Sequence, residues 1–167
     1  MIGAETIADV YSRLSTALGS DKIVIMGGAA VKLAADPQRK ISDVDVIVLL
    51  PYSDFIRREK RLALMDFKLR TGKTISLYDK RNRLELDLGT KRFFGPKGES
   101  FGMQNGAIAS SSATKIIKSG VGQVNCRIMG PAQLLEMKVW LLLNRTHHLN
   151  KKAMDKRDII SILKKFY

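Results

Sequence analysis

The stretch KIVIMGGAAVKLAADPQRKISDVDVIVLL, residues 22–50, decides the fold. Its apolar run at 22–26 predicts a buried strand that ends at a Gly-Gly pair. Residues 28–35 predict a short helix that stops before Pro37, because the residue before a proline is disfavoured in helices. Residues 43–50 then predict a second apolar strand. We therefore expect a glycine turn beside the start of a buried strand.

That second strand opens with two aspartates, Asp43 and Asp45. Alternate residues of a strand point to the same side, so the two carboxylates aim together. Asp is disfavoured in strands, and two at i and i+2 indicate a site for Mg²⁺ or Mn²⁺, the alternative being a solvated strand end. Gly27 and Gly28 would let backbone N–H groups approach a phosphate at the start of the helix, although a tight strand-to-helix turn has the same composition.

A third carboxylate is expected from the alternating segment at 83–88. Its leucines predict a core face, and Glu85 and Asp87 lie on the opposite face. Nucleotidyl transfer by the two-metal mechanism needs carboxylates that bridge metal ions about 3.5–4 Å apart. Asp87 is the candidate to join Asp43 and Asp45, Glu85 is the second choice, and a polar edge-strand face is the alternative.

Two lysines are candidates for phosphate binding. Lys138 lies in the middle of a leucine face, formed at helical spacing by Leu134, Leu135, Leu141 and Leu142. Its charge should have a specific target, either a triphosphate or a site carboxylate, unless it reaches solvent at the edge of the core. Lys156, with Lys152 and Arg157 nearby, could bind nucleotide or RNA phosphates, or form a solvated helix face. Ser42 could hold a site carboxylate in place.

The remaining sequence predicts further helices and strands and no internal repeat or linker, so we expect a single domain over 1–167. Residues 153–166 predict a terminal helix with Ile159, Ile160, Leu163 and Phe166 inward, and 147–152 predict a loop before it. The other expected elements are helices at 4–18, 53–66 (N-capped by Ser53), 113–117 and 130–146, and strands at 74–78, 83–88 and 121–129, with a turn at 79–82.

The charge of the chain is strongly positive, with 29 Lys and Arg against 16 Asp and Glu, a net +13. Residues 1–56 hold five basic and seven acidic residues, whereas 57–97 hold thirteen basic and five acidic. An acidic segment in a basic protein suits a metal site that acts on a polyanion, with RNA or DNA as the obvious partners. The alternative is a basic protein without a nucleic-acid partner.

Other classes of protein are disfavoured by composition. A single cysteine excludes an internal disulfide framework, and two histidines argue against a Cys/His zinc site. There is no apolar run of about 18 residues and no basic-then-apolar N-terminus, so neither a membrane span nor a signal peptide is expected. A reducing, cytoplasmic setting is the expectation.

These motifs resemble those of the polymerase-β-like nucleotidyltransferase superfamily. Its signature is an apolar strand, Gly-Gly or Gly-Ser, a short helix, Asp-x-Asp on the next strand and a later carboxylate, similar here to Gly27, Gly28, Asp43, Asp45 and Asp87. Within it, the chain is similar to the small single-domain proteins related to abortive-infection and toxin–antitoxin nucleotidyltransferases. Their further motifs resemble Arg39 and Ser42, the helix segment from Pro131 to Lys138, and the segment from Lys156 to Ile159.

The resemblance implies an α/β (α+β) nucleotidyltransferase fold, with a mixed, twisted β-sheet flanked by helices. It implies transfer of an NMP from an NTP to a hydroxyl acceptor, with Mg²⁺ or Mn²⁺ and release of pyrophosphate. The resemblance implies metal-binding and catalytic roles for Asp43, Asp45 and Asp87. It implies nucleotide binding by Gly27, Gly28, Ser42, Lys138 and Lys156.

The basic charge favours RNA of the tRNA type as the acceptor of such an enzyme. An acidic protein partner that blocks the site is conceivable. Two rival functions stay open: a non-catalytic nucleic-acid-binding module on the same fold, and a small-molecule nucleotidyltransferase.

Overall fold

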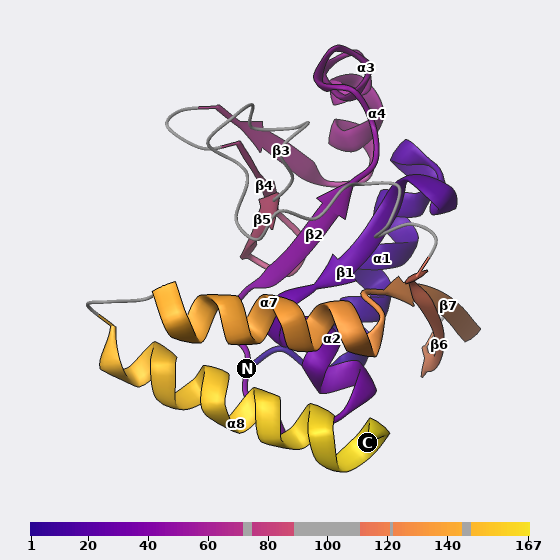
Figure 1. Cartoon of the computed structure of the whole chain (residues 1–167). Coiled ribbons are helices and arrows are strands. Elements are labelled where there is room, and N and C mark those ends of the chain that lie inside the picture. Colours follow the sequence, from indigo (N-terminus) through magenta and orange to yellow (C-terminus); the bar gives the residue numbers. More distant parts are fainter. Residues whose placement is uncertain (72–74, 89–110, 121, 145–147) are drawn as a thin grey trace.

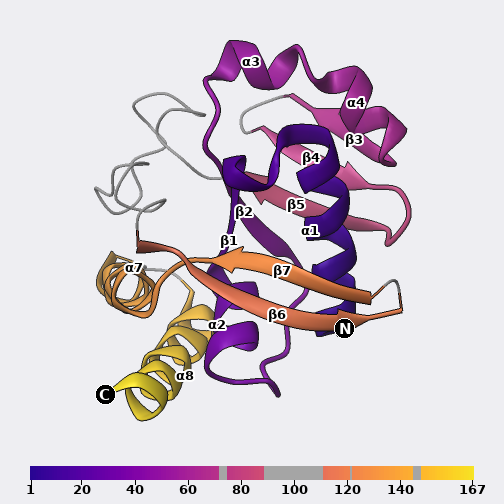
Figure 2. The same cartoon turned by 90° about the vertical axis from the view of Figure 1, so that its right-hand side faces the viewer.

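The computed structural model describes residues 1–71, 75–88, 111–120, 122–144 and 148–167 (Figures 1 and 2). These residues form one mixed sheet of seven strands in the order β3-β4-β5-β2-β1-β7-β6. The strands are β1 (Ile23–Met26), β2 (Val44–Val48), β3 (Phe67–Arg70), β4 (Ser76–Asp79), β5 (Leu84–Leu88), β6 (Ala113–Ser119) and β7 (Gly122–Ile128).

Helices cover the sheet from two sides, with α1 (Ala4–Leu18) and α7 (Pro131–Asn144) on opposite sides of it (Figures 1 and 2). α2 (Gly27–Ala34) packs against α7 and against α8 (Leu149–Phe166). The shorter α3 (Tyr52–Ile56) and α4 (Glu59–Leu64) lie at the far end from α8 (Figure 1). None of the helices in the described ranges is long and apolar enough to cross a membrane. The mixed sheet and its helical layers confirm the fold class expected from the sequence.

The centre of the sheet is formed by residues 22–50, which contain β1 and β2. β1 pairs antiparallel with β2, with Met26 opposite Asp45, and β2 pairs parallel with β5, with Asp45 opposite Asp87. β1 and β2 are almost wholly buried because neighbours cover both faces. In β5, by contrast, the leucines are buried and Asp87 is exposed, as the alternation predicted. The register therefore brings the end of β1, the start of β2 and the middle of β5 together.

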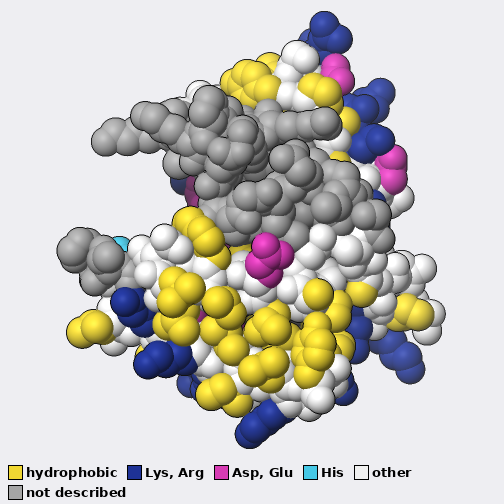
Figure 3. Space-filling view, in the orientation of Figure 1, with side chains coloured by type: hydrophobic (Ala, Val, Ile, Leu, Met, Phe, Trp, Pro, Cys, Tyr) yellow, Lys and Arg dark blue, Asp and Glu magenta, His cyan; other side chains and the backbone are white. Residues whose placement is uncertain are grey.

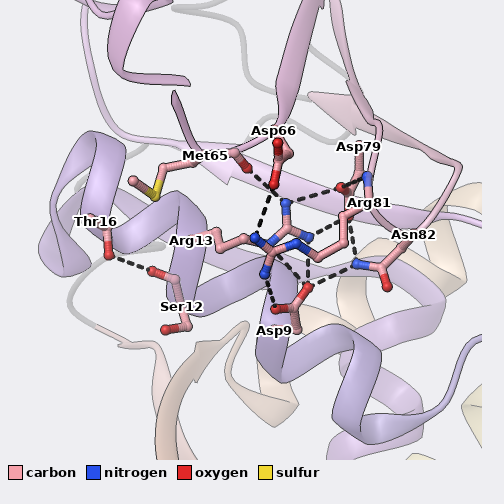
Figure 4. Close-up of polar contacts among 9 residues, drawn as sticks. All are labelled: Asp9, Ser12, Arg13, Thr16, Met65, Asp66, Asp79, Arg81 and Asn82. Carbon is pink, nitrogen blue, oxygen red and sulfur yellow. Dashed lines mark hydrogen bonds and ion pairs between the residues drawn. The ribbon is translucent and has the colours of Figure 1, made fainter. Parts of the chain in front are cut away.

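A buried ion-pair cluster anchors α1 to the turn between β4 and β5 (Figure 4). Arg13 donates to both carboxylate oxygens of Asp79, at 3.0 and 2.6 Å, and to Asp9 and the Met65 carbonyl. Asn82 donates to Asp79 and Asp9 from the turn itself. Burial alone would raise the pKa of Asp79, but hydrogen bonds from Arg13 and Asn82 lower it overall. The cluster fixes the start of β5, and so the position of Asp87.

Several predicted elements are confirmed with boundary shifts. The helix at 4–18 is α1, the strand at 22–26 is β1, the helix at 28–35 is α2, and the strand at 43–50 is β2. Strands expected at 74–78, 83–88 and 121–129 are β4, β5 and β7, with residues 74 and 121 outside the described residues. The helix expected at 130–146 is α7, of which residues 145 and 146 lie outside the described part.

The predicted continuous helix at 53–66 is wrong. Two short helices, α3 and α4, stand there, and the first is preceded by Pro51 rather than capped by the Ser53 side chain. The break falls at Arg57 and Arg58, where the Arg58 guanidinium donates to the Leu18 carbonyl at the end of α1. The chain then enters β3, a strand that the sequence did not predict.

The helix predicted at 113–117 is also wrong, because these residues belong to β6. β6 pairs antiparallel with β7 along its whole length, with Ile117 opposite Val124. Ile116 and Ile117 are β-branched, and such residues favour strands once a partner strand is present.

The terminal helix differs from the prediction in both its start and its orientation. α8 begins at Leu149, so the predicted loop at 147–152 is wrong from residue 149 onward, and its buried residues are Asp155, Asp158 and Ile162. Three residues expected inward, Ile160, Leu163 and Phe166, are 52, 42 and 41% exposed. Apolar side chains accordingly gather on the outer surface over α7 and α8 (Figure 3). Buried charges, described below, decide this orientation.

Candidate functional site

Three carboxylates converge where β1, β2 and β5 meet. Asp43 precedes β2, Asp45 lies on it, and Asp87 lies on β5 directly opposite Asp45. One carboxylate oxygen from each lies within 4.8 Å of the other two. Three carboxylates this close repel one another unless a cation neutralises them, and oxygen ligands in this number suit a hard divalent cation such as Mg²⁺ or Mn²⁺. The donor set therefore fits the metal that the sequence predicted.

The electrostatics of Asp87 reflect this crowding. Its pKa is raised first by partial burial and then by the charges of Asp43 and Glu85, while Lys151 opposes the shift. Glu85, the alternative third carboxylate, is engaged elsewhere, because it accepts hydrogen bonds from Ser76 and, at 2.8 Å, from Arg70. Asp87 is thus the carboxylate of β5 that faces the other two.

Gly27 is the residue that makes room for this cluster. Its φ of +62° lies in the left-handed region, and a Cβ added there would stand 1.9 Å from Oδ2 of Asp45. Any side chain at this position would collide with the carboxylate. At Gly28 the space is less restricted, because an added Cβ would meet the Ile41 side chain at 3.2 Å. The Gly-Gly pair therefore lets the start of α2 lie against the carboxylates.

A cavity of about 280 Å³ opens over the three carboxylates. Gly28 and Ser42 line it, and so does Lys138, so the structure brings these predicted residues to the same site as the carboxylates. Two exposed cations at its edge, Lys40 and Lys151, were missed by the sequence analysis. Lys151 was missed because its segment was predicted as a loop. It stands in the first turn of α8, which extends over the cavity.

Lys138 is buried and engaged in ion pairs at the floor of the cavity. Its Nζ lies 3.1 Å from Oδ1 of Asp155 and 2.8 Å from Oδ2 of Asp158. Arg39 completes the cluster with two hydrogen bonds to Asp158, at 2.6 and 3.2 Å. Asp155 and Asp158 therefore pair with residues outside their own helix. They join α8 to α7 and to the segment that precedes β2.

Lys156 is the predicted site residue that the structure does not bring to the carboxylates. It is exposed and lines a second hollow on α8, together with Arg157, Lys164 and Lys165. The helix explains this separation, because Asp155 faces the first cavity and the next residue is turned by about 100°.

Comparisons with known proteins bear on the fold. No family model and no curated protein matches the chain. Among solved structures, an antigenic nucleotidyltransferase-like protein from Paracoccidioides brasiliensis is similar over 96% of this chain and 75% of its own, with 19% identity and a TM-score of 0.65. The antibiotic-resistance factor ANT(2'')-Ia is similar over 92% and 84%, with 12% identity and a TM-score of 0.51.

A lincosamide antibiotic adenylyltransferase, LnuA, covers 93% of each chain at 14% identity and a TM-score of 0.49. At these identities the likeness concerns the fold. The chain has the nucleotidyltransferase fold, as the resemblance of its motifs predicted. The finer similarity to abortive-infection and toxin–antitoxin members stays a prediction.

Proposed function

We propose that this chain is a metal-dependent nucleotidyltransferase that moves an NMP from an NTP to a hydroxyl acceptor, with RNA as the acceptor. The observation that carries the proposal is the convergence of Asp43, Asp45 and Asp87 within 4.8 Å, against a glycine turn on a nucleotidyltransferase fold. The alternative, a solvated strand end, does not explain why a Cβ at Gly27 would collide with the Asp45 carboxylate.

In the proposed reaction the three carboxylates would hold Mg²⁺ or Mn²⁺. When bound, the metal neutralises the triphosphate and polarises the acceptor hydroxyl. The start of α2 presents backbone N–H groups and a positive dipole end at Gly28, which suits a phosphate. Lys40 and Lys151, exposed at the cavity edge, would add positive charge that favours binding of the triphosphate and departure of pyrophosphate.

The chemical step forms one bond and breaks one bond. The acceptor oxygen attacks the α-phosphorus in line, and the bond from that phosphorus to the pyrophosphate oxygen breaks. The hydroxyl proton passes to a site carboxylate or to water. Catalysis then depends on positioning and charge neutralisation rather than on a covalent intermediate.

Lys138 has a positioning role in this proposal. Its Nζ is occupied by Asp155 and Asp158, so it is not a free cation for the triphosphate. It instead fixes α8 against α7, which holds Lys151 at the cavity edge. Ser42, exposed beside Asp43, is proposed to orient that carboxylate.

The acceptor is inferred from charge, since a protein of net +13 attracts polyanions. A small-molecule acceptor is the second candidate, because ANT(2'')-Ia, which shares the fold, is an antibiotic-resistance factor. The acidic protein partner and the cytoplasmic setting stay predictions.

The experiment incubates the protein with each α-labelled NTP, Mg²⁺ or Mn²⁺, and total cellular RNA. Asp45→Asn removes one carboxylate charge from the site, and Asp54→Asn makes the same change on the exposed α3 as a matched control. Label in RNA with the parent and with Asp54→Asn, but not with Asp45→Asn, supports the proposal. Label only in small molecules favours the second candidate. No label in RNA, protein or small molecules refutes transfer and favours the non-catalytic binding module.

A further inference from the structure

A second hollow, of about 620 Å³, is lined by α8 and by residues 35 and 36 before β2. Its walls carry four cations, Lys156, Arg157, Lys164 and Lys165, and we call it the basic groove. Its apolar lining residues are Ala35, Ala153 and Ile160. Asp36 is its acidic residue and pairs with Arg157, at 3.5 Å. The proposed reaction at the carboxylates uses none of these cations.

The cations of the basic groove stand in two rows along the helix. Lys156 and Lys164 are eight residues apart, with Ile160 between them, and Arg157 and Lys165 repeat this spacing around Ser161. At a rise of about 1.5 Å per residue each row spans about 12 Å. A stacked nucleic-acid strand advances about 3.4 Å per nucleotide, so the groove matches three to four phosphates.

The basic groove adjoins the carboxylate cavity. Ala153 and Lys156 line the groove, whereas Met154 and Asp155, in the same turn of α8, line the cavity. The segment before β2 also lines both hollows, because Asp36 lines the groove and Lys40 lines the cavity. The same turn of α8 and the same segment before β2 therefore line both hollows.

We propose that the basic groove binds the backbone of a single-stranded RNA acceptor and directs its end to Asp43, Asp45 and Asp87. This inference rests on the proposed function and names the acceptor's binding surface. The cations bind the phosphates, and the apolar lining residues contact the sugars or bases. The Ser161 hydroxyl and the Asp36 carboxylate are groups that a ribose 2′-hydroxyl can hydrogen-bond, which favours RNA over DNA.

The test measures binding rather than turnover, so its outcome does not depend on whether transfer occurs. Fluorescence anisotropy of a labelled 12-nucleotide RNA is titrated with the protein at several salt concentrations. Lys164→Gln/Lys165→Gln removes two groove cations. Lys115→Gln/Lys118→Gln removes two exposed cations from β6, a strand that does not line the groove, and is the matched control.

The groove variant is expected to weaken RNA binding about tenfold or more and to reduce the slope of log K against log salt by about 1.4, since each single-strand phosphate contact contributes about 0.7. The control is expected to keep the parent slope. Equal losses in both variants would show attraction by net charge alone and would overturn the assignment. Unchanged binding in the groove variant would overturn it as well.

Two further arms test the kind of nucleic acid. Duplex RNA or single-stranded DNA of the same sequence, bound as tightly as the single-stranded RNA, would overturn the corresponding part of the proposal. If the groove variant loses RNA binding relative to its matched control while the transfer assay fails with the parent, the groove assignment stands and the transferase proposal fails.

Discussion

Gly27→Ala tests whether the glycine turn exists to admit the Asp45 carboxylate. At φ +62° an L-residue costs roughly 1–2 kcal/mol, because Cβ then crowds the following carbonyl. The new methyl group would also stand 1.9 Å from Oδ2 of Asp45, well below van der Waals contact, so the carboxylate or the start of α2 must move by about 1 Å or more. A displacement of about 1 Å at a reacting centre can cost about 10²-fold in rate.

Three readouts separate these effects. At 2–4 °C per kcal/mol, the backbone strain alone is expected to lower Tm by about 2–8 °C. Stabilisation by added Mn²⁺ is expected to shrink or vanish, because one ligand is displaced, and transfer is expected to fall about 100-fold or more.

Gly28→Ala is the matched control, one residue away. Its added Cβ meets Ile41 at 3.2 Å, a contact that a small side-chain shift relieves, so Tm and metal response should stay near those of the parent. If the two variants behave alike in Tm and in response to Mn²⁺, the reasoning that Gly27 serves Asp45 is refuted.

Three further predictions concern charge. The raised pKa of Asp87 means that its charge destabilises the metal-free protein as pH rises through that pKa. Asp87→Asn should therefore raise Tm at pH 7 without divalent cation. This gain in Tm should disappear near pH 3.8 and below, and thermal unfolding at both pH values would show the difference. Asp79→Asn removes the fully buried carboxylate that pairs with Arg13, which keeps Asp9 and the Met65 carbonyl, and should cost about 3–5 kcal/mol of unfolding free energy in urea. Asp66→Asn, in an exposed pair, should cost about 0–1 kcal/mol, and similar losses in the two variants would contradict the assignment of the buried cluster. Lys138→Met should also cost about 3–5 kcal/mol, and should lower transfer by displacing α8; transfer that survives in the folded variant would remove its positioning role.

The centre of the fold and the carboxylate site could be predicted from the sequence because both depend on local patterns. Two apolar runs, a Gly-Gly pair and alternating aspartates indicate the two strands, the turn between β1 and α2 and the direction of the aspartate side chains. None of these patterns depends on residues far away in the sequence. The third carboxylate, Asp87, also followed from alternation. Its placement opposite Asp45 required the parallel register of β2 and β5, which the sequence alone does not specify.

The misplaced elements are those whose state depends on distant partners. β6 is a strand because β7 lies beside it, and the helix at 53–66 is interrupted where Arg58 bonds to the end of α1. Lys151, Lys164 and Lys165 were missed because the start and orientation of α8 depend on contacts with α7 and with the segment before β2. Hydrophobic periodicity within α8 pointed to the wrong face.

The orientation of α8 follows from comparing two burial choices. Turning Ile160, Leu163 and Phe166 inward would bury side chains that are now about half exposed, and would gain about 1–1.5 kcal/mol each, or roughly 3–4.5 kcal/mol in total. The same rotation would take Asp155 and Asp158 away from Lys138 and Arg39. Leaving a buried charge without its partner costs about 3–5 kcal/mol, and here two cations would lose theirs.

The charge pairs therefore outweigh the apolar face, and the helix lies with its carboxylates inward. One consequence is that Lys151 stands at the cavity edge and the four cations of the basic groove point away from the core. The buried ion pairs thus determine what α8 presents to both hollows. Replacing them by apolar residues of similar size could preserve stability, but nothing would then keep the helix in the orientation that the proposed site requires.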